Sequence, residues 1–253
     1  MRKLFFIALL LSFITNAQDN QEAVIFENVM LTVQPGKSKQ FEKAVAYHNK
    51  KFHNQDAYGC RVYWIASGPN SGKYIWSMPS TWSSMDTRPQ DENGHNDDWA
   101  ANVEPTLKAE VHTSYWKTND KHSRIHKDFK LDKLLITFFD IKRGKGKEAM
   151  DLIAKVKKVY AEKIPNETYG VYTNEMGSTK EGRDLALVWF FEKSSWMSDD
   201  HEFPKKYGEM YGEGSWDTFL KEWYDATNGS ETELWVYRPD LSGLSAEVVA
   251  ASN

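Results

Sequence analysis

His48 is the residue whose type and position best suit chemistry. It lies on the apolar stripe of a predicted helix, three residues after Val45 and four before Phe52. The matching position of a second, similar helix is Val156. A buried imidazole can act as an acid, a base or a metal ligand. The alternative is a core histidine that only satisfies a nearby carbonyl or hydroxyl group, because buried polar groups usually find a partner.

The other histidines and the single cysteine predict no metal site. His53 follows His48 by five residues, which places the two about 140° apart around a helix. His122 and His126 have the spacing i, i+4, but they lie in a charged segment without the glutamate of an HExxH motif, and we expect a solvated linker. Cys60 alone cannot supply a cysteine-based zinc site, and we expect it to be buried in a strand.

Residues 91–98 (DENGHNDD) form an acidic cluster with one histidine, His95. The spacing differs from that of an EF-hand, and Gly94 comes too early for the turn of such a loop. A solvated surface loop is the favoured interpretation, and cation binding is left open. Asp98 and Trp99 also suit the start of a helix, where an acidic side chain is favourable.

The composition is that of a globular protein. The 253 residues include 14% aromatic residues, among them 10 Trp, and the formal net charge is −4. A mild acidic excess without a basic cluster excludes an ordinary nucleic-acid-binding surface. The chain also lacks the GxSxG, P-loop and GxGxxG motifs, so hydrolase and nucleotide-binding functions lose support.

The first 17 residues resemble a secretory signal peptide. Arg2 and Lys3 precede an apolar run over 4–14, and a short polar stretch ends at the small residue Ala17. Eleven apolar residues are too few to span a bilayer. We therefore expect a periplasmic or secreted protein that starts near Gln18 and is not attached to a membrane; the alternative is a buried N-terminal helix.

The rest of the chain contains one pattern twice. Residues 28–39 (NVMLTVQPGKSK) match 133–147 (KLLITFFDIKRGKGK), with Thr32 opposite Thr137. Further along, Tyr58-Gly59 matches Tyr169-Gly170, and a strand with Trp76 matches one with Trp189. Each half closes with a helix that carries Trp residues and a last strand. We interpret this as the duplication of one domain.

Each half predicts the order β-α-β-β-α-β, with first helices over 38–53 and 145–163. This is the order of the ferredoxin-like fold, an antiparallel sheet covered on one face by two helices. Strands such as 134–139 and 185–191 are apolar on both sides, so the second sheet face must also be buried. The prediction is an α+β protein in which repeats over 24–118 and 131–240 pack sheet to sheet, with a connector over 119–130 and a tail over 241–253.

This duplicated unit resembles the dimeric α/β-barrel superfamily, whose best-known branch is similar to antibiotic-biosynthesis monooxygenases. The resemblance covers nearly the whole chain after residue 17 and depends on element order rather than on a diagnostic motif. It implies an intramolecular barrel, either as a monomer with two pseudo-dimeric halves or as a higher homo-oligomer. Its members include cofactor-independent oxygenases, isomerases, haem-degrading enzymes and proteins without known reaction, and the fold alone does not choose among them.

The strands carry more aromatic residues than sheet packing needs, and these suit a pocket for a small apolar or aromatic molecule. If the protein is an enzyme, the resemblance implies cofactor-independent oxygenation or isomerisation. His48 would then be the catalytic proton-transfer group, and Tyr63, Trp76, His112 and Trp116 would bind the ligand. The rival function is a non-catalytic binding or scaffolding module, and haem binding or degradation is a weaker alternative. An enclosed cavity that touches His48 favours ligand binding, and a filled interior there favours the scaffold.

Overall fold

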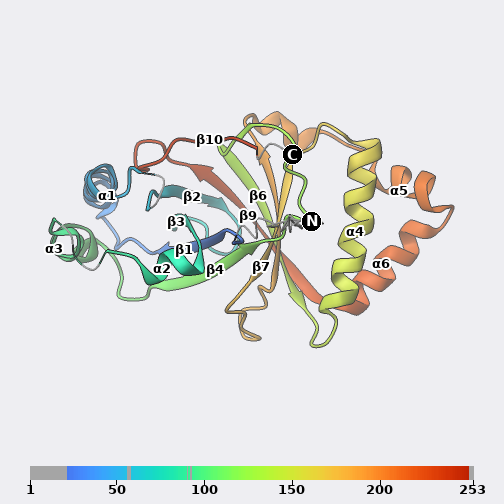
Figure 1. Ribbon diagram of the computed structural model, residues 1–253, viewed down its shortest axis with the longest axis horizontal. Coiled ribbons are helices and arrows are strands. Elements are labelled where there is room, and N and C mark those ends of the chain that lie inside the picture. The colour runs from blue at the N-terminus through green and yellow to red at the C-terminus, as the bar shows by residue number, and fades with distance from the viewer. Residues whose placement is uncertain (1–21, 56–57, 90, 92, 251–253) are drawn as a thin grey trace, which may run out of the picture.

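The computed structural model describes residues 22–55, 58–89, 91 and 93–250 of the protein (Figure 1). The predicted signal peptide, residues 1–17, lies outside these residues. Within the part of the chain that is described, no helix combines the length and the apolar character needed to cross a membrane.

The first half follows the predicted order, with an irregular second helical region. Its strands and its first helix are β1 (Ile25–Leu31), α1 (Ser38–Phe52), β2 (Arg61–Ser67), β3 (Tyr74–Ser80) and β4 (His112–Thr118). Between β3 and β4 the chain forms short helical pieces, α2 (Trp82–Asp86), α3 (His95–Asp98), a π-helical turn (Trp99–Val103) and a 3-10 turn (Glu104–Thr106). π-Helical turns are rare and often occur at functional sites.

The second half has the same order with regular helices. Its elements are β6 (Lys133–Ile141), α4 (Gly146–Lys163), β7 (Tyr169–Asn174), β8 (Leu185–Phe191), a 3-10 turn (Ser194–Ser198), α5 (Phe203–Tyr211), α6 (Ser215–Ala226) and β9 (Thr227–Tyr237). Two short strands, β5 (Phe129–Lys130) and β10 (Glu247–Val248), pair with each other outside the main sheet. The two halves thus confirm the predicted β-α-β-β-α-β repeats.

The eight long strands close into one antiparallel barrel. Its order is β1-β3-β2-β9-β6-β8-β7-β4, and β4 returns to β1. Each half contributes four adjacent strands, and the halves join edge to edge where β2 pairs with β9 and β4 pairs with β7. Closure leaves none of these eight strands with an unpaired edge, which a half on its own could not achieve. The predicted fold class, an α+β protein with an intramolecular barrel, is confirmed.

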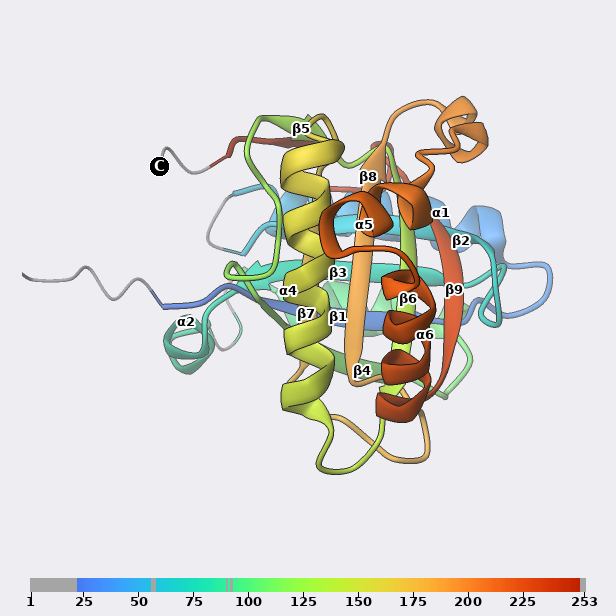
Figure 2. The ribbon, with the colours of Figure 1, turned by 90° about the vertical axis from the view of Figure 1, so that its right-hand side faces the viewer.

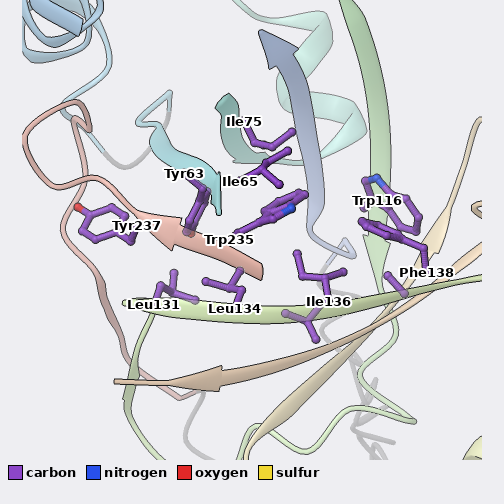
Figure 3. Close-up of a cluster of buried hydrophobic side chains, with 12 residues drawn as sticks. Tyr63, Ile65, Ile75, Trp116, Leu131, Leu134, Ile136, Phe138, Trp235 and Tyr237 are labelled. Atoms are coloured by element: carbon purple, nitrogen blue, oxygen red, sulfur yellow. The ribbon is translucent and has the colours of Figure 1, made fainter. Parts of the chain in front are cut away.

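The barrel interior is a packed core of aromatic and aliphatic side chains (Figure 3). Residues that pair across β2 and β3 share a face of the sheet. Tyr63 pairs with Ile75 and both belong to this interior core. Val62 pairs with Trp76, and both face outward into a separate core beneath α1. Alternation therefore assigns Tyr63 and Trp76 to opposite sides of the sheet.

Helices cover the barrel on two opposite sides. In Figure 1, α1 and α3 lie at one end of the molecule and α4, α5 and α6 at the other. Figure 2 shows these last three helices side by side over the strands of the second half. Their apolar faces meet around the buried side chains of Leu152, Val159, Tyr207 and Phe219.

Two details of the repeat differ from the sequence-based expectation. Thr32 lines a cavity that also contains the interior residue Phe138, whereas Thr137, next to Phe138 in β6, faces the outside, where its hydroxyl group contacts Thr232. Thr32 and Thr137 therefore face opposite sides of the sheet and are not equivalent positions of the repeat. Tyr58 also lies in a loop before β2, although Tyr169 begins β7.

The connector and the C-terminal segment are more ordered than their composition suggests. His122 and Ser123 of the connector are buried, and the Ser123 hydroxyl group accepts a hydrogen bond from the Val171 amide. Leu241 and Ser242 are also buried. The segment after β9 therefore returns to the first half instead of extending from it as a tail.

This returning segment contacts the end of α1 so closely that it requires a glycine. A Cβ atom built at Gly243 would lie 1.8 Å from the carbonyl oxygen of His53. We expect Gly243→Ala to destabilise the protein by about 1–3 kcal/mol, because backbone atoms must move apart. This lowers Tm by about 2–4 °C for each kcal/mol in a protein of this size.

Gly208→Ala in α5 is the matched control, since a Cβ atom there meets nothing within 4 Å. Alanine favours a helix interior by about 1 kcal/mol over glycine, so this variant should be neutral or more stable. Thermal unfolding of both variants makes the comparison. Equal Tm values for Gly243→Ala and the natural protein would contradict the packing described.

Cys60 is fully buried just before β2, and burial raises the pKa of its thiol to about 12. The thiol is therefore protonated at pH 8, and it is also shielded from reagents. We expect no reaction with the disulfide reagent DTNB in the native protein and one thiol per chain after unfolding in guanidinium chloride. Rapid labelling of the native protein would show that this part of the core opens readily.

Candidate functional site

A pocket of about 700 Å³ lies between the outer face of the first-half sheet and the helical segments that cover it. Val29, Trp76 and Met78 form its floor on β1 and β3. His48 and Phe52 of α1 form one wall, and residues 93–100 form another. The cavity touches His48, as the sequence-based criterion required, but it is partly open to solvent and not enclosed.

His48 is fully buried within this pocket wall, on the same face of α1 as Phe41, Val45 and Asn49. Its Nδ1 atom lies 2.8 Å from a carboxylate oxygen of Asp98. Because a carboxylate only accepts, Nδ1 carries the proton and Nε2 keeps a lone pair. Nε2 is buried and has no hydrogen-bond partner. Burial lowers the pKa of His48, and the hydrogen bond to Asp98 opposes this effect.

His53 is the first residue after α1 and has left helical geometry, with φ −128° and ψ 36°. Its Nδ1 atom lies 2.8 Å from the carbonyl oxygen of Tyr58 and must donate to it. Its Nε2 atom therefore also keeps a lone pair. Burial lowers the pKa of His53 to about 4, so the ring is neutral at pH 7.

His95 reaches the same place from the acidic segment. Asn93 and Gly94 before it both have positive φ values, 58° and 75°, and this turn begins α3. Glycine favours such a conformation because it has no Cβ atom. The Nε2 atom of His95 lies 3.0 Å from Nε2 of His53, and its Nδ1 atom lies 3.0 Å from the side-chain oxygen of Asn96.

The three imidazoles form one cluster. One ring nitrogen from each of His48, His53 and His95 lies within 4.8 Å of the other two. Among the described residues, this is the one group of three or more histidine, cysteine or acidic side chains that is compact enough to hold a metal ion. Imidazole nitrogens are ligands for zinc, copper, iron and nickel.

Aromatic rings and a buried amide position the cluster. Trp99 stands edge to face against His48 with ring centroids 5.1 Å apart, and Trp76 does so against His53 at 5.0 Å. The indole N–H of Trp76 donates to the side chain of Asn49, which in turn donates to the carbonyl group of Leu241. The returning C-terminal segment therefore fixes the pocket floor.

The structure separates the five residues that the sequence analysis assigned to the site. Trp76 lines the pocket with His48, as expected. Tyr63 lies in the barrel interior, where its ring contacts Trp235 and Tyr237. His112 and Trp116 line a second cavity of about 360 Å³, and His112 pairs there with Glu181. Strand alternation is the reason, because Trp116 and Tyr63 face inward and Trp76 faces outward.

Sequence reasoning missed His53, His95 and Asp98 as members of the site. It treated His53 as part of the helix, but the chain turns at this residue and brings the ring back toward His48. It treated residues 91–98 as a solvated loop, whereas the carboxylate of Asp98 is only 11% exposed and faces His48. The histidine within the acidic run was the available signal for a site.

The equivalent space in the second half is filled. Val156 of α4, which matches His48, packs among apolar residues. Phe139 and Trp223 meet edge to face there, and the rings of Tyr160 and Phe203 also make contact. The duplicated domain thus has a polar pocket in one half and an apolar core in the other.

No protein-family model and no curated protein matches this chain. Solved structures do. A proposed monooxygenase from Fusobacterium nucleatum is 12% identical, with a TM-score of 0.55, and the match covers 86% of this chain and 94% of that one. A second proposed monooxygenase, from Lactobacillus acidophilus, is also 12% identical, with a TM-score of 0.53 over 91% and 100% of the two chains.

A mutant chlorite dismutase from Candidatus Nitrospira defluvii, solved with cyanide, has a TM-score of 0.51 at 7% identity, over 88% of this chain and 94% of that one. These similarities extend over both halves of the chain and agree with its closed barrel of two ferredoxin-like repeats. The protein therefore has the dimeric α/β-barrel fold, with both halves fused in a single chain.

Proposed function

We propose that the protein binds a small organic molecule in the first-half pocket and acts on it at the end where the three histidines lie. The observation that carries this proposal is the pocket itself, about 700 Å³ in volume and in contact with His48. A pocket of this size is in the range of small-molecule sites. The second half has the structural role in this proposal, because it closes the barrel and fills its own equivalent space.

The pocket wall indicates a ligand with a flat apolar body and a polar group. Trp76, Met78 and Trp99 supply apolar surface, whereas the histidines lie together at one place. Arg88 adds a cationic group, held by Glu27 at 2.6 Å, and its Nε atom is buried without a partner. An aromatic compound with a hydroxyl, carbonyl or carboxylate group has matching chemistry. Oxygenation or isomerisation of such a compound is the finer reaction class that we propose.

Haem fits this site poorly. An axial histidine must direct a free nitrogen toward an open planar space. Here Nε2 of His53 faces Nε2 of His95 at 3.0 Å, and the His48 and His95 ring centroids are 4.8 Å apart. Each imidazole thus occupies the space in front of its neighbour's nitrogen, where the haem plane would have to lie. We therefore propose no reaction that uses haem.

Filling the pocket tests the proposal. Ala100 lines the pocket and Ala101 does not, although both are exposed and adjacent in the π-helical turn. The probe is 1-anilinonaphthalene-8-sulfonate, a flat aromatic anion whose fluorescence rises in apolar surroundings. We expect Ala100→Trp to weaken its binding about 10-fold or more, because about 1.4 kcal/mol of lost contact energy has this effect.

Ala101→Trp is the matched control and should bind the probe as the natural protein does. Circular dichroism and thermal unfolding show whether both variants keep the fold. If Ala100→Trp is folded and binds the dye with unchanged affinity, the dye binds elsewhere and the assignment of this pocket as the ligand site is wrong.

A further inference from the structure

Hydrogen-bond accounting fixes the tautomers of two of the clustered histidines. His48 must donate from Nδ1 to the carboxylate of Asp98, and His53 must donate from Nδ1 to the carbonyl group of Tyr58. A neutral imidazole carries only one N–H group, so both Nε2 atoms hold lone pairs. Each second nitrogen is thus oriented by an oxygen, the arrangement that metal-binding histidines almost always have.

The two lone pairs belong to one cluster, in which His48 and His53 are buried and His95 is half-buried. Nε2 of His48 is buried and has no hydrogen-bond partner. Nε2 of His53 faces a third imidazole nitrogen, from His95, at 3.0 Å. Lone pairs at this separation repel each other unless a proton or a cation lies between them. A buried unsatisfied polar atom is also costly, so the cluster calls for an electron-pair acceptor.

We propose that His48, His53 and His95 together bind one divalent transition-metal ion, and that Asp98 is the positioning residue that orients His48 for this role. The site lies in the pocket proposed above and adds a metal centre to that function. The role of His48 then becomes that of a ligand instead of the proton-transfer group that the sequence suggested.

The donor set selects the class of metal. Three neutral imidazoles suit zinc, copper, iron, cobalt or nickel, whereas magnesium and calcium prefer oxygen ligands. Asp98 is not in the compact group of three, so its carboxylate stands behind His48 instead of completing the ligand shell. Three protein ligands leave one position of a tetrahedral ion open, which is typical of catalytic zinc sites.

The observed spacing is close to what such an ion requires. Nitrogens bound to zinc at about 2.0–2.1 Å lie about 3.3 Å apart in a tetrahedron. The His53 and His95 nitrogens are already 3.0 Å apart, and all three ligand atoms lie within 4.8 Å of one another. Small rotations of side chains therefore complete the site, without any rearrangement of α1 or α3.

The test is metal binding by the untagged protein, because a histidine tag would bind the same ions. The protein is treated with a chelator, dialysed and titrated calorimetrically with Zn²⁺, and in parallel with Mg²⁺. Titration with Co²⁺ adds a readout, since tetrahedral Co²⁺ gives visible absorption bands. We expect one equivalent of Zn²⁺ to bind, intense Co²⁺ bands to appear, and Mg²⁺ to show no binding at the same site.

Variants assign the ligands. His95→Ala should weaken Zn²⁺ binding about 100-fold or more and abolish the tetrahedral Co²⁺ spectrum. Asp98→Asn keeps the shape of the side chain and should weaken binding about 10–100-fold, the effect typical of outer-shell partners. His112→Ala, which removes a histidine from the second cavity, should bind Zn²⁺ as the natural protein does.

Absence of Zn²⁺ and Co²⁺ binding to the natural protein would overturn the proposal, and so would unchanged affinity in a folded His95→Ala variant. Unchanged affinity in Asp98→Asn would overturn the positioning role. The dye experiment on the chelator-treated protein keeps the two proposals separate. Dye binding that Ala100→Trp weakens, without any metal binding, retains the ligand pocket and removes the metal centre. Zn²⁺ binding, with a dye affinity that Ala100→Trp leaves unchanged, retains the metal centre and removes the ligand pocket.

Discussion

The pairing of strand edges between the two halves is the constraint on which the structure depends. Each half alone is a four-stranded sheet with two open edges and an apolar inner face. Pairing β2 with β9 and β4 with β7 satisfies these edges and encloses the inner faces in one step. Large side chains occupy most of the interior, and the larger ligand space lies on the outside of the barrel, beneath the covering helices.

The outer sheet faces of the two halves are covered differently, although both halves have the same order of strands and helices. In the second half, α4, α5 and α6 cover the sheet with packed aromatic rings, which stabilise the fold. In the first half, the corresponding segment is irregular and holds His95, Asp98 and Trp99 against α1. A buried imidazole with an unsatisfied nitrogen is unfavourable for stability alone. The well-packed second half can offset this loss of stability, since both halves share one barrel.

Periodicity and repetition were sufficient to predict the barrel, because the apolar pattern of each strand and helix is local. The candidate site was predicted only in part. His48 and Trp76 are on regular elements, so helix and strand geometry placed them correctly. Tyr63 and Trp116 were assigned to the same site as His48 but lie in the barrel interior, because the sequence did not show which of the two apolar strand faces lies inward.

His53 and His95 required information that a pattern does not contain. The direction of the first ring depends on a single non-helical residue after α1, and the direction of the second depends on two left-handed residues before α3. Asp98 belongs to a run of acidic residues in which its neighbour Asp97 is exposed. Its partner lies 50 residues earlier in the chain. Such contacts arise from loop conformation and not from composition.

The return of the C-terminal segment to the first half has a consequence for biosynthesis. Leu241 accepts the hydrogen bond that holds Asn49 and, through it, Trp76, and Gly243 packs on the carbonyl group of His53. These residues are synthesised after all three histidines. The first half can form its sheet early, but its pocket gains its final support only after residues 241–243 have been made. A chain cut before Leu241 would therefore carry all three histidines without the backbone that aligns them, so the readiness of the site depends on a segment that lies far along the chain.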